Sequence, residues 1–113
     1  VTVSVMSHDE ALLVLCTAPS AGDVAETLAR GLVEQRLAAC VNVVAGVRSF
    51  YRWQGNVEDD AEVQLLIKTS RQRFDALERW LTANHPYDVP EIIALPVVAG
   101  SAAYLSWLHE QLG

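Results

Sequence analysis

Cys16 and His85 are the side chains in this sequence best suited to binding a metal ion. Cys16 lies in an apolar run, where a thiol is either a small buried hydrophobe or a soft ligand for Cu(I), Hg(II) or Zn(II). His85 directly precedes Pro86, and its imidazole suits either the end of a helix or a metal ion. One thiolate and one imidazole supply half of a tetrahedral site. The sequence therefore predicts a weak, exchangeable site that water or a second subunit completes.

The second cysteine, Cys40, stands where a helical segment passes into a long strand. A thiol at this place either packs within the fold or lies at an interface cleft. The chain contains no pairing of a nucleophile with a base, no Gly-rich phosphate loop, and neither Cys-x-x-Cys nor His-Glu-x-x-His spacing. We therefore expect no enzymatic activity and no organic cofactor.

The segment before Cys40 predicts one strand and one helix. Residues Ala11–Thr17 form a continuous apolar run, which ends at Ala18-Pro19 and is short enough for a buried strand. Apolar side chains then recur at helical spacing, which predicts an amphipathic helix over Ala21–Leu37. Ser20 stands where its hydroxyl would accept a hydrogen bond from the first turn of that helix.

From Ala39 onward the apolar period changes to two, which is typical of a long hairpin. We expect seven alternate residues to share one face of its first strand, namely Val41, Val43, Ala45, Val47, Ser49, Tyr51 and Trp53. The turn Gln54-Gly55-Asn56, with a positive φ at Gly55, leads into a return strand. That strand has apolar residues from Ala61 to Ile67 on one face and Glu62 to Lys68 on the other.

The last third of the chain predicts a helix, a strand and a second helix. The first helix spans Ser70–Asn84 and ends before Pro86, with Asn84 suited to a left-handed cap. Glu91–Val98 is a strand that Pro96 marks as an edge or a bulge. Gly100-Ser101 opens the last helix.

The predicted order is β-α-β-β-α-β with a C-terminal helix, an α+β ferredoxin-like antiparallel sheet in a single domain, residues 1–113. In this sheet the first strand lies between the third and the fourth, which argues against a Cys16–Cys40 disulfide. Two helices cover one face, so the other face should be polar. Leu12–Leu15 and Ile92–Leu95 are nevertheless apolar on both faces. We expect identical copies to bury the second face and the hairpin to reach a neighbour.

Composition excludes several classes of partner. The net charge of −6 repels phosphate backbones, and no cluster of Lys and Arg compensates, so we expect no nucleic-acid partner. No apolar run approaches the roughly 20 residues that span a bilayer, so we expect no membrane partner. Residues 1–10 lack the pattern of a signal peptide, and two cysteines make no disulfide framework. We therefore expect a cytoplasmic protein.

Six strings, in order from about Leu12 to Leu112, resemble the CutA family of divalent-cation tolerance proteins. They are Leu15-Cys16-Thr17-Ala18-Pro19, Leu37-Ala38-Ala39-Cys40-Val41-Asn42, Ser49-Phe50-Tyr51-Arg52-Trp53-Gln54-Gly55, Glu62 to Thr69, His85-Pro86-Tyr87-Asp88-Val89-Pro90-Glu91 and Tyr104-Leu105-Ser106-Trp107. The resemblance implies a homotrimer of ferredoxin-like protomers with a link to copper and other divalent cations. It also implies that Cys16, Asn84 and His85 occupy positions that bind copper, although some members carry a histidine where this chain has Asn84.

The same strings contain polar residues that suit a small pocket between subunits. They are Cys40, Tyr51, Glu62, Lys68, Tyr87 and Glu91. Glu62 and Lys68 share one face of a strand, so they form either an ion pair across subunits or part of a pocket for an anion or a metal complex. In the pocket, Lys68 would supply the positive charge and the tyrosines would donate hydrogen bonds.

Three functions follow from these observations. The first is a homotrimeric, copper-binding or divalent-cation-binding protein with an accessory role in cation tolerance and the response to metal ions. The second is a ligand-sensing trimer that resembles the PII signalling proteins, although the long hairpin lacks a Gly-rich nucleotide loop. The third is a structural module that anchors a partner.

Overall fold

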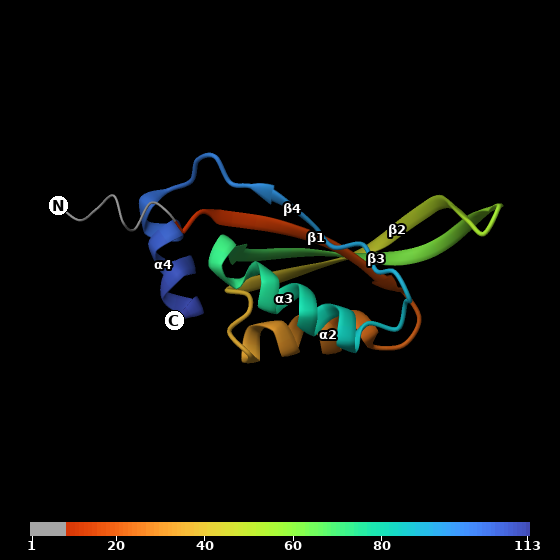
Figure 1. The fold of residues 1–113 in the computed structure, drawn as a ribbon, viewed down its shortest axis with the longest axis horizontal. Helices are drawn as coiled ribbons and strands as arrows, with labels where there is room; N and C mark the ends of the chain where they lie inside the picture. The colour runs from red at the N-terminus through yellow and green to blue at the C-terminus, as the bar shows by residue number, and fades with distance from the viewer. Residues whose placement is uncertain (1–8) are drawn as a thin grey trace.

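A four-stranded antiparallel sheet and three helices make up residues 9–113, the part of the chain that the computed structural model describes (Figure 1). The strands lie in the order β2-β3-β1-β4. The elements are β1 (Ala11–Pro19), α2 (Val24–Glu34), β2 (Cys40–Trp53), β3 (Asn56–Ser70), α3 (Arg71–Asn84), β4 (Ile93–Pro96) and α4 (Ala102–Leu112). This is the ferredoxin-like arrangement that the sequence predicts, with β1 between β3 and β4.

The main core lies between one face of the sheet and the helices α2 and α3. Alternate residues of the two central strands contribute to it, among them Val14 on β1 and Leu65 on β3, which are fully buried. Leu28 of α2 and Leu77 of α3 cover them. The apolar residues that alternate along the strands therefore face the apolar residues at helical spacing in α2 and α3, on the same side of the sheet.

Helix α2 is shorter at both ends than the predicted Ala21–Leu37. Its N-cap is Asp23, and no side-chain hydrogen bond caps the helix, so the expected role of Ser20 is wrong. At the other end Arg36 adopts a φ of 57°, and the amide of Leu37 donates to the carbonyl of Leu32. This pair of features is a Schellman motif, which ends a helix by satisfying its last carbonyl groups.

A bulge in β2 changes which of its residues share a face. Val44 pairs with Gln64 of β3, but the next regular pair is Val47 with Glu62, so β2 contains one extra residue at this place. Gly46, with a φ of +85°, accommodates it. Val41 and Val43 thus lie on the core face, whereas Val47, Ser49, Tyr51 and Trp53 lie on the opposite face. The single face predicted for Val41–Trp53 is therefore wrong.

Beyond the bulge, β2 and β3 project from the body of the molecule as a long hairpin (Figure 1). The hairpin gives the molecule its long dimension of 55 Å, compared with 25 and 24 Å across. Gly55 has the expected positive φ, and Gln54 before it also has a positive φ of 50°. Two consecutive left-handed residues make a type I′ turn, whose twist matches that of paired strands.

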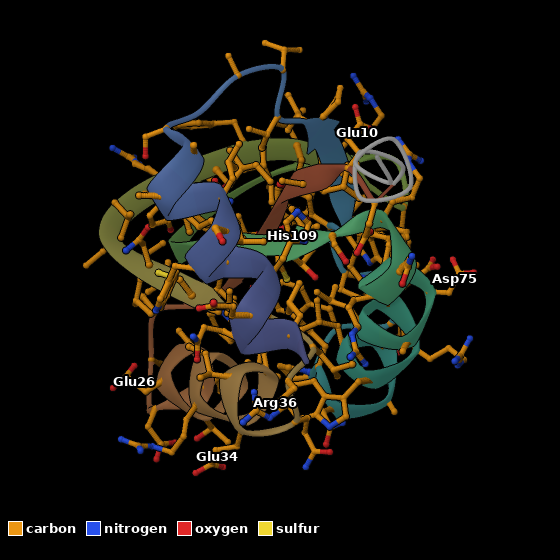
Figure 2. All side chains as sticks on the ribbon, turned by 90° about the vertical axis from the view of Figure 1, so that its left-hand side faces the viewer. Glu10, Glu26, Glu34, Arg36, Asp75 and His109 are labelled. Atoms are coloured by element: carbon orange, nitrogen blue, oxygen red, sulfur yellow. The ribbon has the colours of Figure 1, made fainter. Side chains whose placement is uncertain are left out.

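Strand β4 is shorter than the predicted Glu91–Val98, and it lies at the edge of the sheet, as Pro96 indicated. Helix α4 follows it and lies across one end of the sheet, where Figure 2 shows it with His109. Leu108 and Leu112 of α4 pack there against Ala11 and Ala39 in a second, smaller core. Ser101 caps α4 by accepting a hydrogen bond from the amide of Tyr104 at 3.2 Å.

The face of the sheet opposite α2 and α3 is apolar and largely uncovered in the single chain. The register places Leu13 and Leu15 of β1 beside Leu95 and Ile93 of β4, and Leu15 beside Leu66 of β3. Leu95 is 45% exposed and Ile93 is 54% exposed. We call these five residues, with Val44 of β2, the second sheet face. Within residues 9–113 no helix has the length and apolarity needed to cross a membrane.

Candidate functional site

A cavity of about 550 Å³ lies between the hairpin and the segment that joins α3 to β4. Its lining residues are Thr17, Ser49, Phe50, Tyr51, Trp53, Glu62, Tyr87, Asp88, Val89 and Glu91. They come from β1, β2, β3 and residues 87–91, which are far apart in the sequence. The bulge at Gly46 matters here because it puts Ser49, Tyr51 and Trp53 on the same face as Glu62. We call this space the hairpin cavity.

Glu62 is the most buried charged residue of the hairpin cavity, with 5% of its surface exposed. The hydroxyl of Tyr87 donates to its Oε2 at 2.6 Å. Burial raises the pKa of Tyr87, and the hydrogen bond and negative charge of Glu62 raise it further. Tyr87 therefore stays protonated and continues to donate to Glu62 at any physiological pH.

Tyr51 approaches the same space from the hairpin. Its hydroxyl donates to Oδ2 of Asp60. That hydrogen bond is the main cause that raises the pKa of Tyr51 to about 12, with smaller contributions from desolvation and from the charges of Asp60, Glu58 and Glu62. The two tyrosines of the cavity are thus held as donors to carboxylates of the same chain, and their expected donation to a ligand stays a prediction.

Within the single chain Lys68 and Cys40 lie away from the hairpin cavity, and the predicted pocket of six residues between subunits stays a prediction. Lys68 stands six positions after Glu62 on β3, which is about 20 Å along a strand. Nζ of Lys68 lies 3.8 Å from Sγ of Cys40 and donates a hydrogen bond to Oδ1 of Asn42. Tyr51, Glu62, Tyr87 and Glu91 do come together. Without Lys68 the hairpin cavity of the single chain is acidic, and the predicted pocket between subunits for an anion or a metal complex stays a prediction.

Cys16 is fully buried in the main core, beneath the helices. Burial, with smaller contributions from the charges of Glu91 and Glu62, raises the pKa of its thiol to about 12. The thiol therefore remains protonated near neutral pH, whereas a metal ion binds the thiolate. Both cysteines are free.

His85 has both ring nitrogens engaged in hydrogen bonds. The amide of Tyr87 donates to Nδ1 at 3.1 Å, so Nδ1 must be the acceptor of this bond. Nε2 then carries the proton and donates to the carbonyl of Thr17 at 2.8 Å. The imidazole, 8% exposed, is thereby fixed in one neutral tautomer and ties the end of α3 to β1. A metal ion would have to displace one of these bonds.

Asn84 is the last residue of α3, and its side chain donates to the carbonyl of Trp80 at 2.8 Å. Residues with positive φ between 9 and 113, glycines apart, are Arg36 and Gln54, so the left-handed cap predicted for Asn84 is wrong. In the described part of the chain, no three His, Cys, Asp or Glu residues are placed to hold a metal ion together. Cys16, Asn84 and His85 consequently form no prepared metal site, and their binding of copper stays a prediction.

Sequence reasoning missed several residues that line the cavity, notably Phe50, Asp88 and Thr17. Phe50 and Asp88 stand within strings that the analysis had singled out, directly beside Tyr51 and Tyr87. A count of acidic and aromatic residues in those two strings would have indicated the acidic and aromatic lining of the cavity. The period of two assigned Tyr51 and Trp53 correctly to one face, but without the bulge it could not show that Glu62 shares that face.

Comparisons with known proteins agree with one another. A family model described as CutA1 divalent ion tolerance protein matches residues 12–111. A divalent-cation tolerance protein CutA from Thermus thermophilus is 54% identical over 101 residues, which cover 89% of this chain and 97% of that protein. A protein of the same name from Pectobacterium atrosepticum is 47% identical over 103 residues, which cover 91% and 93%.

Solved structures show the same similarity. A divalent cation tolerance protein from Thermus thermophilus matches with a TM-score of 0.87 and 52% identity, over 91% of this chain and 99% of that one. CutA1 from Oryza sativa matches with a TM-score of 0.87 and 44% identity, over 91% and 94%.

Proposed function

The chain belongs to the CutA1 divalent ion tolerance protein family, and from this premise we propose that it acts as a non-enzymatic homotrimer with an accessory role in divalent-cation tolerance. The observation that carries the proposal is the second sheet face. A monomer would leave its apolar residues, such as Leu95 and Ile93, about half exposed to water. Burial of such a face is the main driving force for association.

Two further features support association. The hairpin projects beyond the protomer and carries exposed aromatic side chains, Phe50 at 64% and Trp53 at 41%. Its long reach suits contact with a neighbouring copy, since exposed aromatic residues are frequent anchors of interfaces. The resemblance of the sequence implies three copies, and the exposed face requires at least one partner.

Sedimentation tests the assembly. We expect a trimer at micromolar concentration, in the absence of added metal, with an interface well above the roughly 2,000 Å² at which obligate interfaces begin. A folded monomer at that concentration would overturn the proposal and leave the second sheet face unexplained.

The link to metal is proposed as weak and exchangeable. Binding of copper at Cys16 and His85 requires a proton to leave a buried thiol and a hydrogen bond of the imidazole to break, and both costs lower affinity. The apo protein should therefore fold and assemble without metal. Titration of the wild type, Cys16→Ser and His85→Ala with Cu(II) and Zn(II) tests the ligands. Lower affinity in both variants is expected, and unchanged affinity would exclude both residues as ligands.

The cytoplasmic location remains a proposal, and fractionation of cells that express the chain with its native N-terminal sequence tests it. Recovery of the protein outside the cytoplasm would contradict it.

The hairpin cavity favours a second candidate function, the sensing of a small ligand. Its volume of about 550 Å³ falls within the range of ligand pockets, about 300–1,000 Å³. A protein that acts only as a structural module has no need of such a cavity. Side-by-side titration with metal ions and small molecules separates the two functions.

A further inference from the structure

We propose that the hairpin cavity binds a small organic cation, an alkylammonium or quaternary ammonium compound. This deepens the candidate function of ligand sensing and does not depend on the role in cation tolerance. Three properties of the cavity carry the inference: its negative charge, its aromatic walls and, among residues 9–113, the lack of a group of metal ligands.

The charge of the hairpin cavity is negative and uncompensated. Glu62, Asp88 and Glu91 line it, and no Lys or Arg is among its lining residues. Glu62 is buried, with 5% of its surface exposed, and its Oε2 accepts a hydrogen bond from the hydroxyl of Tyr87. Its other oxygen, Oε1, accepts no hydrogen bond from residues 9–113. Oε1 is not among the buried side-chain atoms of residues 9–113 that lack a partner, so it is accessible from the cavity and open to a positively charged ligand.

The walls of the hairpin cavity are aromatic. Phe50, Tyr51 and Trp53 line it from the hairpin, and Tyr87 lines it from the opposite side. The ring centroid of Tyr87 lies 4.7 Å from that of His85, and the hydroxyl of Tyr51 donates a hydrogen bond to Asp60. The rings of Tyr87 and Tyr51 are therefore positioned before any ligand enters. Aromatic faces attract cations, and cages of such rings recognise quaternary ammonium groups.

The carboxylates of the cavity do not form a ligand group for a bare metal ion. Among residues 9–113 no three acidic, His or Cys side chains converge on one point. Calcium requires six to eight oxygen ligands around one point, and zinc usually requires four ligands. An organic cation spreads its charge over a larger volume and offers carbon atoms to the aromatic rings. The cavity therefore matches an organic cation better than a metal ion.

Calorimetric titration of the assembled wild-type protein with choline tests the proposal. The control ligand is the uncharged tert-butyl analogue of choline, in which a carbon atom replaces the nitrogen and the shape is retained. We expect choline to bind with a dissociation constant of about 1 mM or lower, and the analogue to bind at least about tenfold more weakly. Higher salt should weaken the binding of choline alone.

Three variants locate the binding. Glu91→Gln and Glu62→Gln each remove one negative charge and keep the size of the side chain, and glutamine at 62 still accepts the hydrogen bond of Tyr87. Each should weaken choline binding about tenfold. Glu78→Gln, on the exposed surface of α3, removes the same charge outside the cavity and should leave binding unchanged. Circular dichroism checks that each variant folds. If Glu62→Gln does not fold, Glu91→Gln alone still tests the proposal.

Several results would overturn the proposal. Equal affinity for choline and its uncharged analogue would show that the charge of the cavity is irrelevant. The absence of heat up to about 10 mM choline, where a millimolar site is nearly saturated, would show that the cavity takes no such ligand or that a neighbouring copy fills it. Binding of Cu(II) or Zn(II) that is lost in Glu62→Gln and Glu91→Gln, with no binding of choline, would identify a metal site instead. Sedimentation of the same samples reports assembly separately, so failure here is distinguishable from failure of the proposed trimer.

Discussion

Burial at Cys16 couples the ionisation of one thiol to the stability of the whole fold. Its pKa rises from 9.0 to about 12 because the native core disfavours the thiolate, and Glu91 and Glu62 add to the effect. The fold keeps its full stability below pH 9, because the thiol is then neutral in both the folded and the unfolded chain. That stabilisation is lost as pH rises from 9 towards 12, by about 1.4 kcal/mol per pH unit.

We therefore predict that Cys16→Ala flattens the alkaline loss of stability. Between pH 9 and about 10.5 the wild type should lose about 1–2 kcal/mol more than this variant, measured by denaturant unfolding at a fixed protein concentration. Each protein is compared with itself at the two pH values, so the stability lost through the small cavity left by alanine cancels. Cys40→Ala, which removes the other thiol, is the control. An equal loss of unfolding free energy with pH in wild type and Cys16→Ala would contradict the prediction.

At the scale of elements, one glycine sets how closely α2 and α3 approach each other. A Cβ atom added at Gly31 of α2 would lie 2.5 Å from Cη2 and 2.6 Å from Cζ2 of the Trp80 ring on α3. Such distances are well inside van der Waals contact. The indole ring of Trp80 thus packs directly on the backbone of α2, which a larger residue at 31 would prevent.

Gly31→Ala should destabilise the protein by about 1–3 kcal/mol, because overpacking outweighs the roughly 1 kcal/mol that alanine contributes to helix propensity. The double variant Gly31→Ala/Trp80→Leu should lose less stability than the sum of the losses in the two single variants, since the smaller side chain at 80 relieves the clash. Thermal melting at matched protein concentration measures all three variants. A more stable Gly31→Ala variant would show that Trp80 moves aside freely.

Two of the three left-handed residues in the hairpin, Gly46 and Gln54, predict changes of opposite sign. Gly46 at the bulge has a φ of +85° and nothing within 4 Å of its missing Cβ, so Gly46→Ala should destabilise through the backbone alone, by about 1 kcal/mol. Gln54 has a φ of 50°, which asparagine tolerates better, so Gln54→Asn should stabilise by less than about 1 kcal/mol. The melting temperatures should move in opposite directions, and a shift of both in the same direction would contradict this account.

At the scale of the whole molecule, the second sheet face predicts which surface changes break the assembly. Leu95 on β4 is 45% exposed in the single chain, and Val33 on α2 is 43% exposed. Leu95→Glu should dissociate the trimer at micromolar concentration, because it buries an unpaired charge at the interface. Val33→Glu makes a similar change on the helix side and should remain assembled. Sedimentation compares the two, and identical behaviour would place the interface elsewhere.

The tip of the hairpin predicts a second effect on assembly. Trp53 is 41% exposed in the single chain, and we expect it to pack against a neighbouring copy. Trp53→Ala should weaken the trimer by at least about 2 kcal/mol, as truncation of an interface anchor does. Arg52→Ala changes the adjacent residue on the other face of β2 and serves as the control. Unchanged dissociation and melting in Trp53→Ala would show that the hairpin does not hold the trimer together.

The sequence by itself determined the order of elements, the sheet topology and the apolar second face. Those features depend on local periodicity, such as the helical spacing of Val24, Leu28 and Leu32, and periodicity is written directly in the chain. The strings that carry the family resemblance also grouped Tyr51, Glu62, Tyr87 and Glu91 with Cys40 and Lys68 in a pocket predicted between subunits.

Only the tertiary structure decided the rest. The bulge at Gly46 shifted the register by one residue, and a shift of one residue moves every following side chain to the other face. Strand length put Lys68 far from Glu62 and left the hairpin cavity acidic. Burial kept Cys16 protonated, and two hydrogen bonds engaged His85. Register, distance and solvation arise from contacts between distant segments, so no local pattern contains them.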